Sequence, residues 1–294
     1  MNPRKRVLDP PSKDEIFDAI LFPNWQNSLA LWESCAEAGI NLSSVVNDEG
    51  YTLLEMMCRV DPLNVQVIEI ILKRGWGNAK RATLKDGKWM QSPLFLVGKT
   101  ATIVGLQESH KKAMDVLKSY GADWNQLADG KYQLFAWVCG AFSPQVIAYI
   151  LSSNEMEAAL NWMSDLGNGW KMTPLGLLAS TRFDYEHGPQ IARMLLDAKA
   201  DPYVVAGFGP QDAHTSWSIL QLATYHANAA LLEFFIPIMD PSCNDASPLT
   251  PHQWKMHLHR ISGRTIGDHC DHLKTWLLTE PLGNGPGSDW ILGR

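Results

Sequence analysis

The sequence predicts an all-α protein, a helical repeat solenoid with capping helices at its N- and C-terminal ends. Three features predict it: a recurring seven-residue segment, a recurring glycine-containing turn, and apolar stripes at helical spacing. The seven-residue segments, called opening segments below, begin 40, 41, 40 and 45 residues apart. A near-constant period of this size is typical of stacked units that bury their apolar faces against their neighbours. The opening segments are Thr52–Cys58, Ser92–Gly98, Gln133–Cys139, Thr173–Ala179 and Ser218–Thr224.

The clearest opening segment is Thr173–Ala179, which reads Thr-Pro-Leu-Gly-Leu-Leu-Ala. A threonine or serine at the first place can cap a helix by accepting a backbone N–H bond, and proline fits the first helical position because its missing donor has no partner there. The leucines and alanine that follow are expected to pack between neighbouring units. Each opening segment therefore predicts the start of a buried helix.

A second marker follows each opening segment, where an apolar helix ends in a Gly-Ala-Asp-like turn. Its clearest copy is Gly121–Asn125, and glycine suits the left-handed conformation that ends many helices. The helix before each turn carries an apolar stripe, such as Val67, Ile68, Ile71 and Leu72. Weaker turns are Gly39–Asn41, Gly75–Asn78, Leu160–Asn161 and Ala200–Pro202.

The two markers, in the same order over roughly residues 35 to 235, resemble the ankyrin repeat family, whose opening is Thr-Pro-Leu-His-x-Ala with a period of about 33 residues. The resemblance implies two helices per unit. The chain departs from the family pattern because its period is longer, which we interpret as loop insertions at Lys99–Ser109, Thr181–Pro189 and Tyr203–His214. The family histidine at the fourth place is also missing, and the residues there are Glu55, Phe95, Ala136, Gly176 and Gln221.

In chain order, the pattern predicts one elongated domain in four parts. Residues 1–13 form a flexible tail rich in proline and charge, and order begins near Ser12. Residues 14–46 form a capping helix pair, the second helix running from Leu29 to Ala38. About five repeats occupy residues 47–241, with strands at most in finger hairpins. Residues 242–294 form a C-terminal helical cap and tail.

Composition narrows the classes of partner. The formal net charge of −6 argues against a broad nucleic-acid surface and mildly favours a basic protein partner. No apolar run reaches the length that would cross a membrane, and the basic N-terminus lacks the apolar core of a signal peptide. The five cysteines show no pairing motif, which fits a cytoplasmic protein. A leaderless route of secretion into a host stays open, as does the oligomeric state.

Chemical motifs are sparse. Val97–Thr100 resembles the end of a phosphate-binding loop, but Pro93 stands where that loop needs glycine. We expect no enzyme, no cofactor and no metal. An enzyme or metalloprotein with a His-rich C-terminal site is the alternative, because histidines three or seven residues apart on a helix share a face and imidazole binds zinc. The histidines of this cluster are His252, His257, His259, His269 and His272.

One large aromatic residue stands just before each opening segment. In the ankyrin family these positions belong to the finger hairpins beside the concave face, which usually binds protein. The resemblance therefore implies a protein–protein interaction module, either an adaptor or effector or an inhibitor of immunity type. Packing between fingers is an equally weighted interpretation of the same residues. The predicted protein-binding residues are Tyr51, Trp89, Tyr132, Trp170 and Trp217, with a rim of Asp48, Glu49, Asp86 and Asp129 to steer a basic partner.

Overall fold

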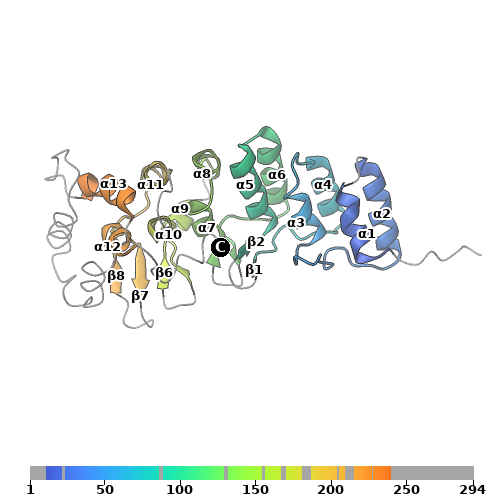
Figure 1. The fold of residues 1–294 in the computed structure, drawn as a ribbon, viewed down its shortest axis with the longest axis horizontal. Coiled ribbons are helices and arrows are strands. Elements are labelled where there is room, and N and C mark those ends of the chain that lie inside the picture. The colour runs from blue at the N-terminus through green and yellow to red at the C-terminus, as the bar shows by residue number, and fades with distance from the viewer. Residues whose placement is uncertain are drawn as a thin grey trace, which may run out of the picture. The chain divides into compact units, whose positions relative to one another are not determined.

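The computed structural model is rich in helix and contains little strand (Figure 1). The chain separates into two compact units, Met1–Gln126 (unit 1) and Leu127–Arg294 (unit 2). The helix-rich class expected from the sequence is confirmed. The predicted C-terminal cap and its histidines lie outside the described residues. The structure describes residues 11–21, 24–85, 89–128, 132–153, 156–166, 170–180, 187–203, 205–208, 215–226 and 228–239.

Unit 1 begins with a helix pair. Ser12 caps α1, and its hydroxyl accepts the N–H of Glu15, whose carboxylate accepts the N–H of Ser12 at 2.6 Å. The buried indole of Trp32 donates to the carbonyl of Ile16 at 2.9 Å, which ties the second helix to the first. The second helix starts earlier than the sequence indicated. The elements are α1 (Lys13–Asp18), the 3₁₀ turn η1 (Ala19–Leu21) and α2 (Trp25–Glu37).

Two further helix pairs complete unit 1. The first helices of the two pairs, α3 and α5, pack against each other, and so do the second helices, α4 and α6. The stripe Val67, Ile68, Ile71 and Leu72 is buried, as the helical spacing predicted. A two-stranded hairpin separates the pairs. The elements are α3 (Leu53–Met57), α4 (Val65–Lys73), β1 (Thr83–Lys85), β2 (Trp89–Gln91), α5 (Pro93–Val104) and α6 (Glu108–Ser119).

The predicted loop insertion at Lys99–Ser109 is wrong in its first half. Helix α5 continues through these residues to Val104 and stops at Gly105, which has a φ of 89°. Ala101 is fully buried, so the turn after the opening segment still gains from packing, and residues 99–104 contain no glycine or proline. Part of the extra distance between the second and third opening segments therefore extends helix α5.

Unit 2 continues the alternation of first and second helices. Helix α10 contacts α7 and α12 on either side, and α11 contacts α8 and α13 (Figure 1). The helix of the opening segment Thr173–Ala179 thus packs between the helices of the opening segments before and after it. The helices are α7 (Leu134–Cys139), α8 (Pro144–Leu151), α9 (Glu157–Leu160), α10 (Pro174–Ser180), α11 (Gly188–Asp197), α12 (Ile219–Tyr225) and α13 (Ala229–Met239).

In unit 2, two hairpins join into one sheet, whereas the sequence predicted strands at most in finger hairpins. Strands β5 to β8 form one four-stranded antiparallel sheet in chain order. The join between the two hairpins is the pairing of β6 with β7, in which Met172 lies opposite Ala206. The insertion expected at Tyr203–His214 thus supplies a strand. The strands are β3 (Leu127–Ala128), β4 (Tyr132–Gln133), β5 (Ser164–Asp165), β6 (Trp170–Met172), β7 (Ala206–Phe208) and β8 (Thr215–Trp217).

The glycine-containing turns end helices in the left-handed conformation. Gly39, Gly75 and Gly121 have φ values of 86°, 73° and 88°, as their place after each helix predicted. The corresponding turn after α11 has Lys199 in this conformation instead, with a φ of 76°. A residue with a Cβ is strained there, because the Cβ approaches the following carbonyl oxygen.

Replacing Lys199 by glycine should therefore stabilise unit 2. Relief of the backbone strain outweighs the larger entropy of an unfolded glycine, and we expect a net gain of about 0.5–1 kcal/mol in the free energy of unfolding. Urea denaturation followed by circular dichroism measures it. Lys199→Ala is the matched control, since it removes the side chain and keeps the Cβ. Equal gains in both variants would show that the lysine side chain, and not the backbone, is responsible.

Candidate functional site

The five aromatic residues predicted to bind protein occupy equivalent places in the structure. Each lies in the turn or strand that leads into the helix of an opening segment. Tyr51 directly precedes Thr52, the N-cap of α3, and Trp217 ends β8 just before α12. Trp89, Tyr132 and Trp170 begin β2, β4 and β6, and their side chains lie outside the described part of the structure. Tyr51 and Trp89 belong to unit 1, and the other three belong to unit 2.

Tyr51 is half-buried in a polar cluster. The guanidinium of Arg59 lies 4.2 Å from the centre of the tyrosine ring, and its Nη1 is 2.8 Å from a carboxylate oxygen of Glu49. The backbone N–H of Tyr51 donates to the side-chain oxygen of Asn47 at 2.9 Å, which holds the turn. The ring is thus positioned at the surface by a cation–π contact and a tight turn.

Trp217 has a different environment. It lies directly opposite Ala206 in the sheet, and Ala206 lies opposite Met172. Residues directly opposite one another share a face of a sheet. Both Ala206 and Met172 are buried, and the indole of Trp217 is half-buried. This location favours packing between fingers for Trp217.

Two of the four acidic residues predicted to form a rim, Asp48 and Glu49, are paired with basic side chains. Asp48 forms an ion pair with Lys13 at 2.7 Å, and Glu49 forms one with Arg59 at 2.8 Å. The pKa of Asp48 is lowered by its hydrogen bond from Lys13. Asp86 and Asp129 lie outside the described residues. The two described carboxylates therefore offer a basic partner less net attraction than their formal charges suggest.

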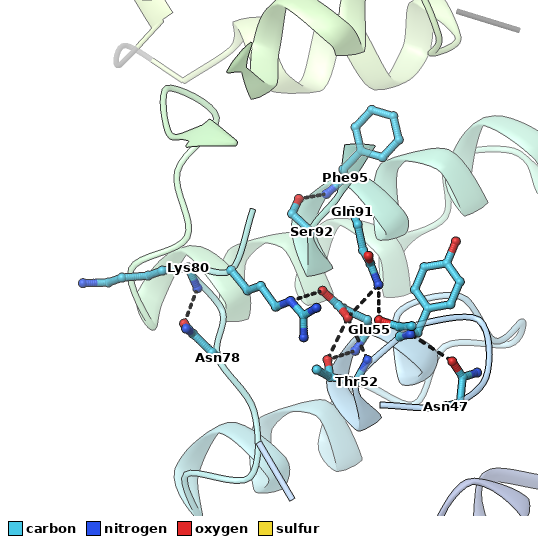
Figure 2. Close-up of polar contacts among 11 residues, drawn as sticks. Asn47, Thr52, Glu55, Asn78, Lys80, Gln91, Ser92 and Phe95 are labelled. Atoms are coloured by element: carbon cyan, nitrogen blue, oxygen red, sulfur yellow. Dashed lines mark hydrogen bonds and ion pairs between the residues drawn. The ribbon is translucent and has the colours of Figure 1, made fainter. Parts of the chain in front are cut away.

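A buried carboxylate links the first two opening segments (Figure 2). Glu55 is fully buried, and one of its oxygens accepts the backbone N–H and the hydroxyl of Thr52 at 2.8 and 2.9 Å. The side-chain amide of Gln91, from the next hairpin, donates to the same oxygen at 3.2 Å and to the carbonyl of Gly50 at 2.8 Å. The second oxygen lies 3.4 Å from Nε of Arg81. Glu55 therefore closes a capping box and also binds the hairpin that precedes the next helix of unit 1.

In the sequence, Glu55 stands out only as a departure from the family histidine. The Thr-x-x-Glu spacing of a capping box could have indicated its helix-capping role. Its bonds to Gln91 and Arg81 join residues 36 and 26 positions away, and nothing in the local sequence pairs them. Only the tertiary structure brings these groups together.

The later opening segments use other groups for the same purpose. The N–H of Gln133 donates to the hydroxyl of Ser164 at 3.1 Å. The N–H and hydroxyl of Thr173 donate to the carbonyl of Val205 at 2.9 and 3.2 Å. In each case the start of one opening segment is bonded to the strand region that precedes the next one. The hairpin side of these segments is therefore fixed by polar contacts as well as by apolar packing.

Other predicted features give no described site. Among the residues that the structure describes, no group of three or more histidine, cysteine, aspartate or glutamate side chains is placed to hold a metal ion. Cys35, Cys58 and Cys139 are buried thiols, and burial raises the pKa of all three. Lys99 and Thr100 lie within α5, so the phosphate-loop resemblance stands inside a helix. No helix in the described part of the chain combines the length and apolar character that a membrane span requires.

No protein-family model matches the chain, and no curated protein matches it in sequence.

Proposed function

We propose that this chain is an ankyrin-like repeat protein that works by binding another protein through the hairpin side of its opening segments. The proposal rests on one observation above all: an aromatic residue precedes the helix of each of the five opening segments, at the junction of strand or turn and helix. Tyrosine and tryptophan are the side chains most enriched among binding hot spots. Tyr51 illustrates the arrangement, since its half-buried ring is held at the surface by Arg59.

The repeat architecture is supported by the contacts between helices. In each unit, helices from opening segments pack on one another, and the helices that follow them do the same. The polar bonds from one opening segment to the strand region before the next support the same interpretation. A stacked array holds its hairpins in place, which lowers the entropy lost when a partner binds them.

The partner that fits is a protein, and the formal charge of −6 favours a basic one. The ion pairs of Asp48 and Glu49 leave apolar and aromatic contacts as the main contribution from the described part of unit 1. An adaptor or effector and an inhibitor would both use such a surface. We place the protein in the cytoplasm, in line with an odd number of cysteines without pairing motifs.

Alanine substitutions at the aromatic positions test the proposal. Affinity purification of the full chain with mass spectrometry first identifies the partner, whose dissociation constant is then measured by calorimetry. Tyr51→Ala, and the pair Tyr132→Ala with Trp170→Ala, should each weaken binding at least about tenfold, because truncating a hot-spot aromatic costs about 2 kcal/mol. The melting temperature should change little.

Trp162→Ala is the matched control for these variants. Trp162 is 50% exposed and lies outside the predicted set, so its loss should leave the dissociation constant within about twofold. Variants of the predicted set that melt early but bind normally would show that the aromatic residues only brace the hairpins. That result would remove the proposed surface.

A further inference from the structure

His110 is a titratable group buried at the start of a helix. It lies in the first turn of α6, and none of its surface is exposed. Its Nδ1 accepts the backbone N–H of Gln107, the N-cap residue, at 3.1 Å. Because Nδ1 is an acceptor, the neutral ring carries its proton on Nε2. This Nε2 is buried without a hydrogen-bond partner in the described part of the chain.

The surroundings oppose a positive charge on this ring. Burial lowers the pKa of His110 from its ordinary value of 6.5, and the carboxylate of Asp61 acts in the opposite direction with a smaller effect. The N-terminal end of α6 carries the positive end of the helix dipole, which also disfavours a cation. The other charged groups on the elements that pack against α6 are exposed. They are Glu69 and Lys73 on α4 and Lys99 on α5, while Glu108 and Lys111 pair with each other on α6 itself.

We propose that His110 makes the start of α6 sensitive to acid. The neutral imidazole holds the first turn of this helix in place, and the protonated imidazole releases it. Protonation puts a hydrogen on Nδ1, so this atom stops accepting the N–H of Gln107. It also places an unpaired cation in a buried position, which is costly. The N–H of Gln107 and the charged ring both regain partners when the turn opens to water.

The release would affect the rest of unit 1. Helix α6 packs against both α4 and α5, so loosening its first turn weakens the end of a stacked pair. The proposal is independent of the aromatic surface, because it concerns folding stability alone. It holds whether or not that surface binds a protein.

The sign of the pH effect follows from proton linkage. The unfolded state takes up a proton on this histidine near pH 6.5, and the native state takes it up only at lower pH. The stabilisation from neutral His110 is complete above pH 6.5 and is lost as the pH falls through the lowered pKa of the folded state. At pH 5.5 the loss in the folding equilibrium constant can reach at most about tenfold, since it is limited by protonation of the unfolded state.

Comparison with His110→Gln isolates this residue from the other histidines. Glutamine keeps an acceptor for the N–H of the N-cap and does not titrate. Between pH 7.5 and 5.5, the folding constant of unit 1 in the wild-type chain should fall several-fold more than that of the variant, up to the limit of about tenfold. Urea denaturation of both full chains measures this. In NMR spectra, the Gln107 amide should shift with the titration of the ring in the wild type alone.

Asp61→Asn provides a second test, in which the imidazole of His110 itself is unchanged. Removing the carboxylate withdraws the one influence that raises the pKa of His110, so the loss of stability at low pH should become larger. An equal pH dependence in the wild type and His110→Gln, with a Gln107 amide that does not follow the ring, would overturn the proposal. A pH dependence that shrinks in Asp61→Asn would do the same.

Discussion

Gly176→Ala should destabilise unit 2 by about 3 kcal/mol, although alanine is the better helix former. Gly176 is the fourth residue of its opening segment and lies in α10. A Cβ built there would overlap the carbonyl oxygen of Val205. That oxygen accepts hydrogen bonds from the N–H and hydroxyl of Thr173, so it cannot move away without breaking them. Urea denaturation followed by circular dichroism measures the free energy of unfolding.

The equivalent place in α7 provides a matched control, because it is occupied by the fully buried Ala136. Ala136→Gly should lose about 1–2 kcal/mol, from helix propensity and one buried methyl group. A Gly176→Ala protein that is as stable as the wild type, or more stable, would contradict the close approach of Val205. Thr173→Val should show part of the same loss, because it removes the hydroxyl that donates to Val205.

Glu55→Ala is expected to destabilise unit 1 by a similar amount, about 3 kcal/mol. The carboxylate is fully buried and accepts bonds from Thr52 and Gln91. Its removal leaves the N–H of Thr52 without this acceptor and Arg81 without its ion-pair partner. Arg81 is 27% exposed in its side chain, so water compensates part of that loss. Thermal unfolding at neutral pH, with calorimetric enthalpy, measures the change.

Two further variants separate the causes of this loss. Glu55→Gln keeps the shape and the capping box but removes the charge, so it should retain most of the stability. Glu15→Ala disrupts the equivalent capping box of α1 at the surface, where water replaces the lost bonds, and it should cost much less. If Glu15→Ala and Glu55→Ala were equally damaging, helix capping alone would explain the effect. The link to Gln91 and Arg81 would then have no measurable role.

The helices and their boundaries were predictable where local chemistry sets them. Thr52 and Ser92 cap α3 and α5 through their side chains, and Gly39 and Gly121 end the helices before them with a positive φ. These effects act within a few residues, so a short segment contains all the information needed. The buried stripe of α4 follows for the same reason, because its period of about 3.6 residues is visible in the sequence.

The places of the five aromatic residues relative to the strands and helices were predictable from the sequence, but their environments were not. All five aromatic residues lie at the junctions indicated by the opening segments. Their surroundings depend on partners from elsewhere in the chain. Tyr51 packs against Arg59, while Trp217 lies beside the buried pair Ala206 and Met172. Aromatic residues at matching places before two opening segments therefore have different surroundings.

By itself, the sequence determined the helical class, the order of the helices and the turns that end them, since capping, propensity and apolar periodicity are local properties. Only the tertiary structure decided what the fourth place of each opening segment does. Glu55 meets Gln91 from the next hairpin, whereas Gly176 leaves room for the carbonyl of Val205. These contacts join residues about 30 to 40 positions apart, at distances set by how one helix pair stacks on the next. Their geometry comes from close packing across the whole unit, which no local segment encodes.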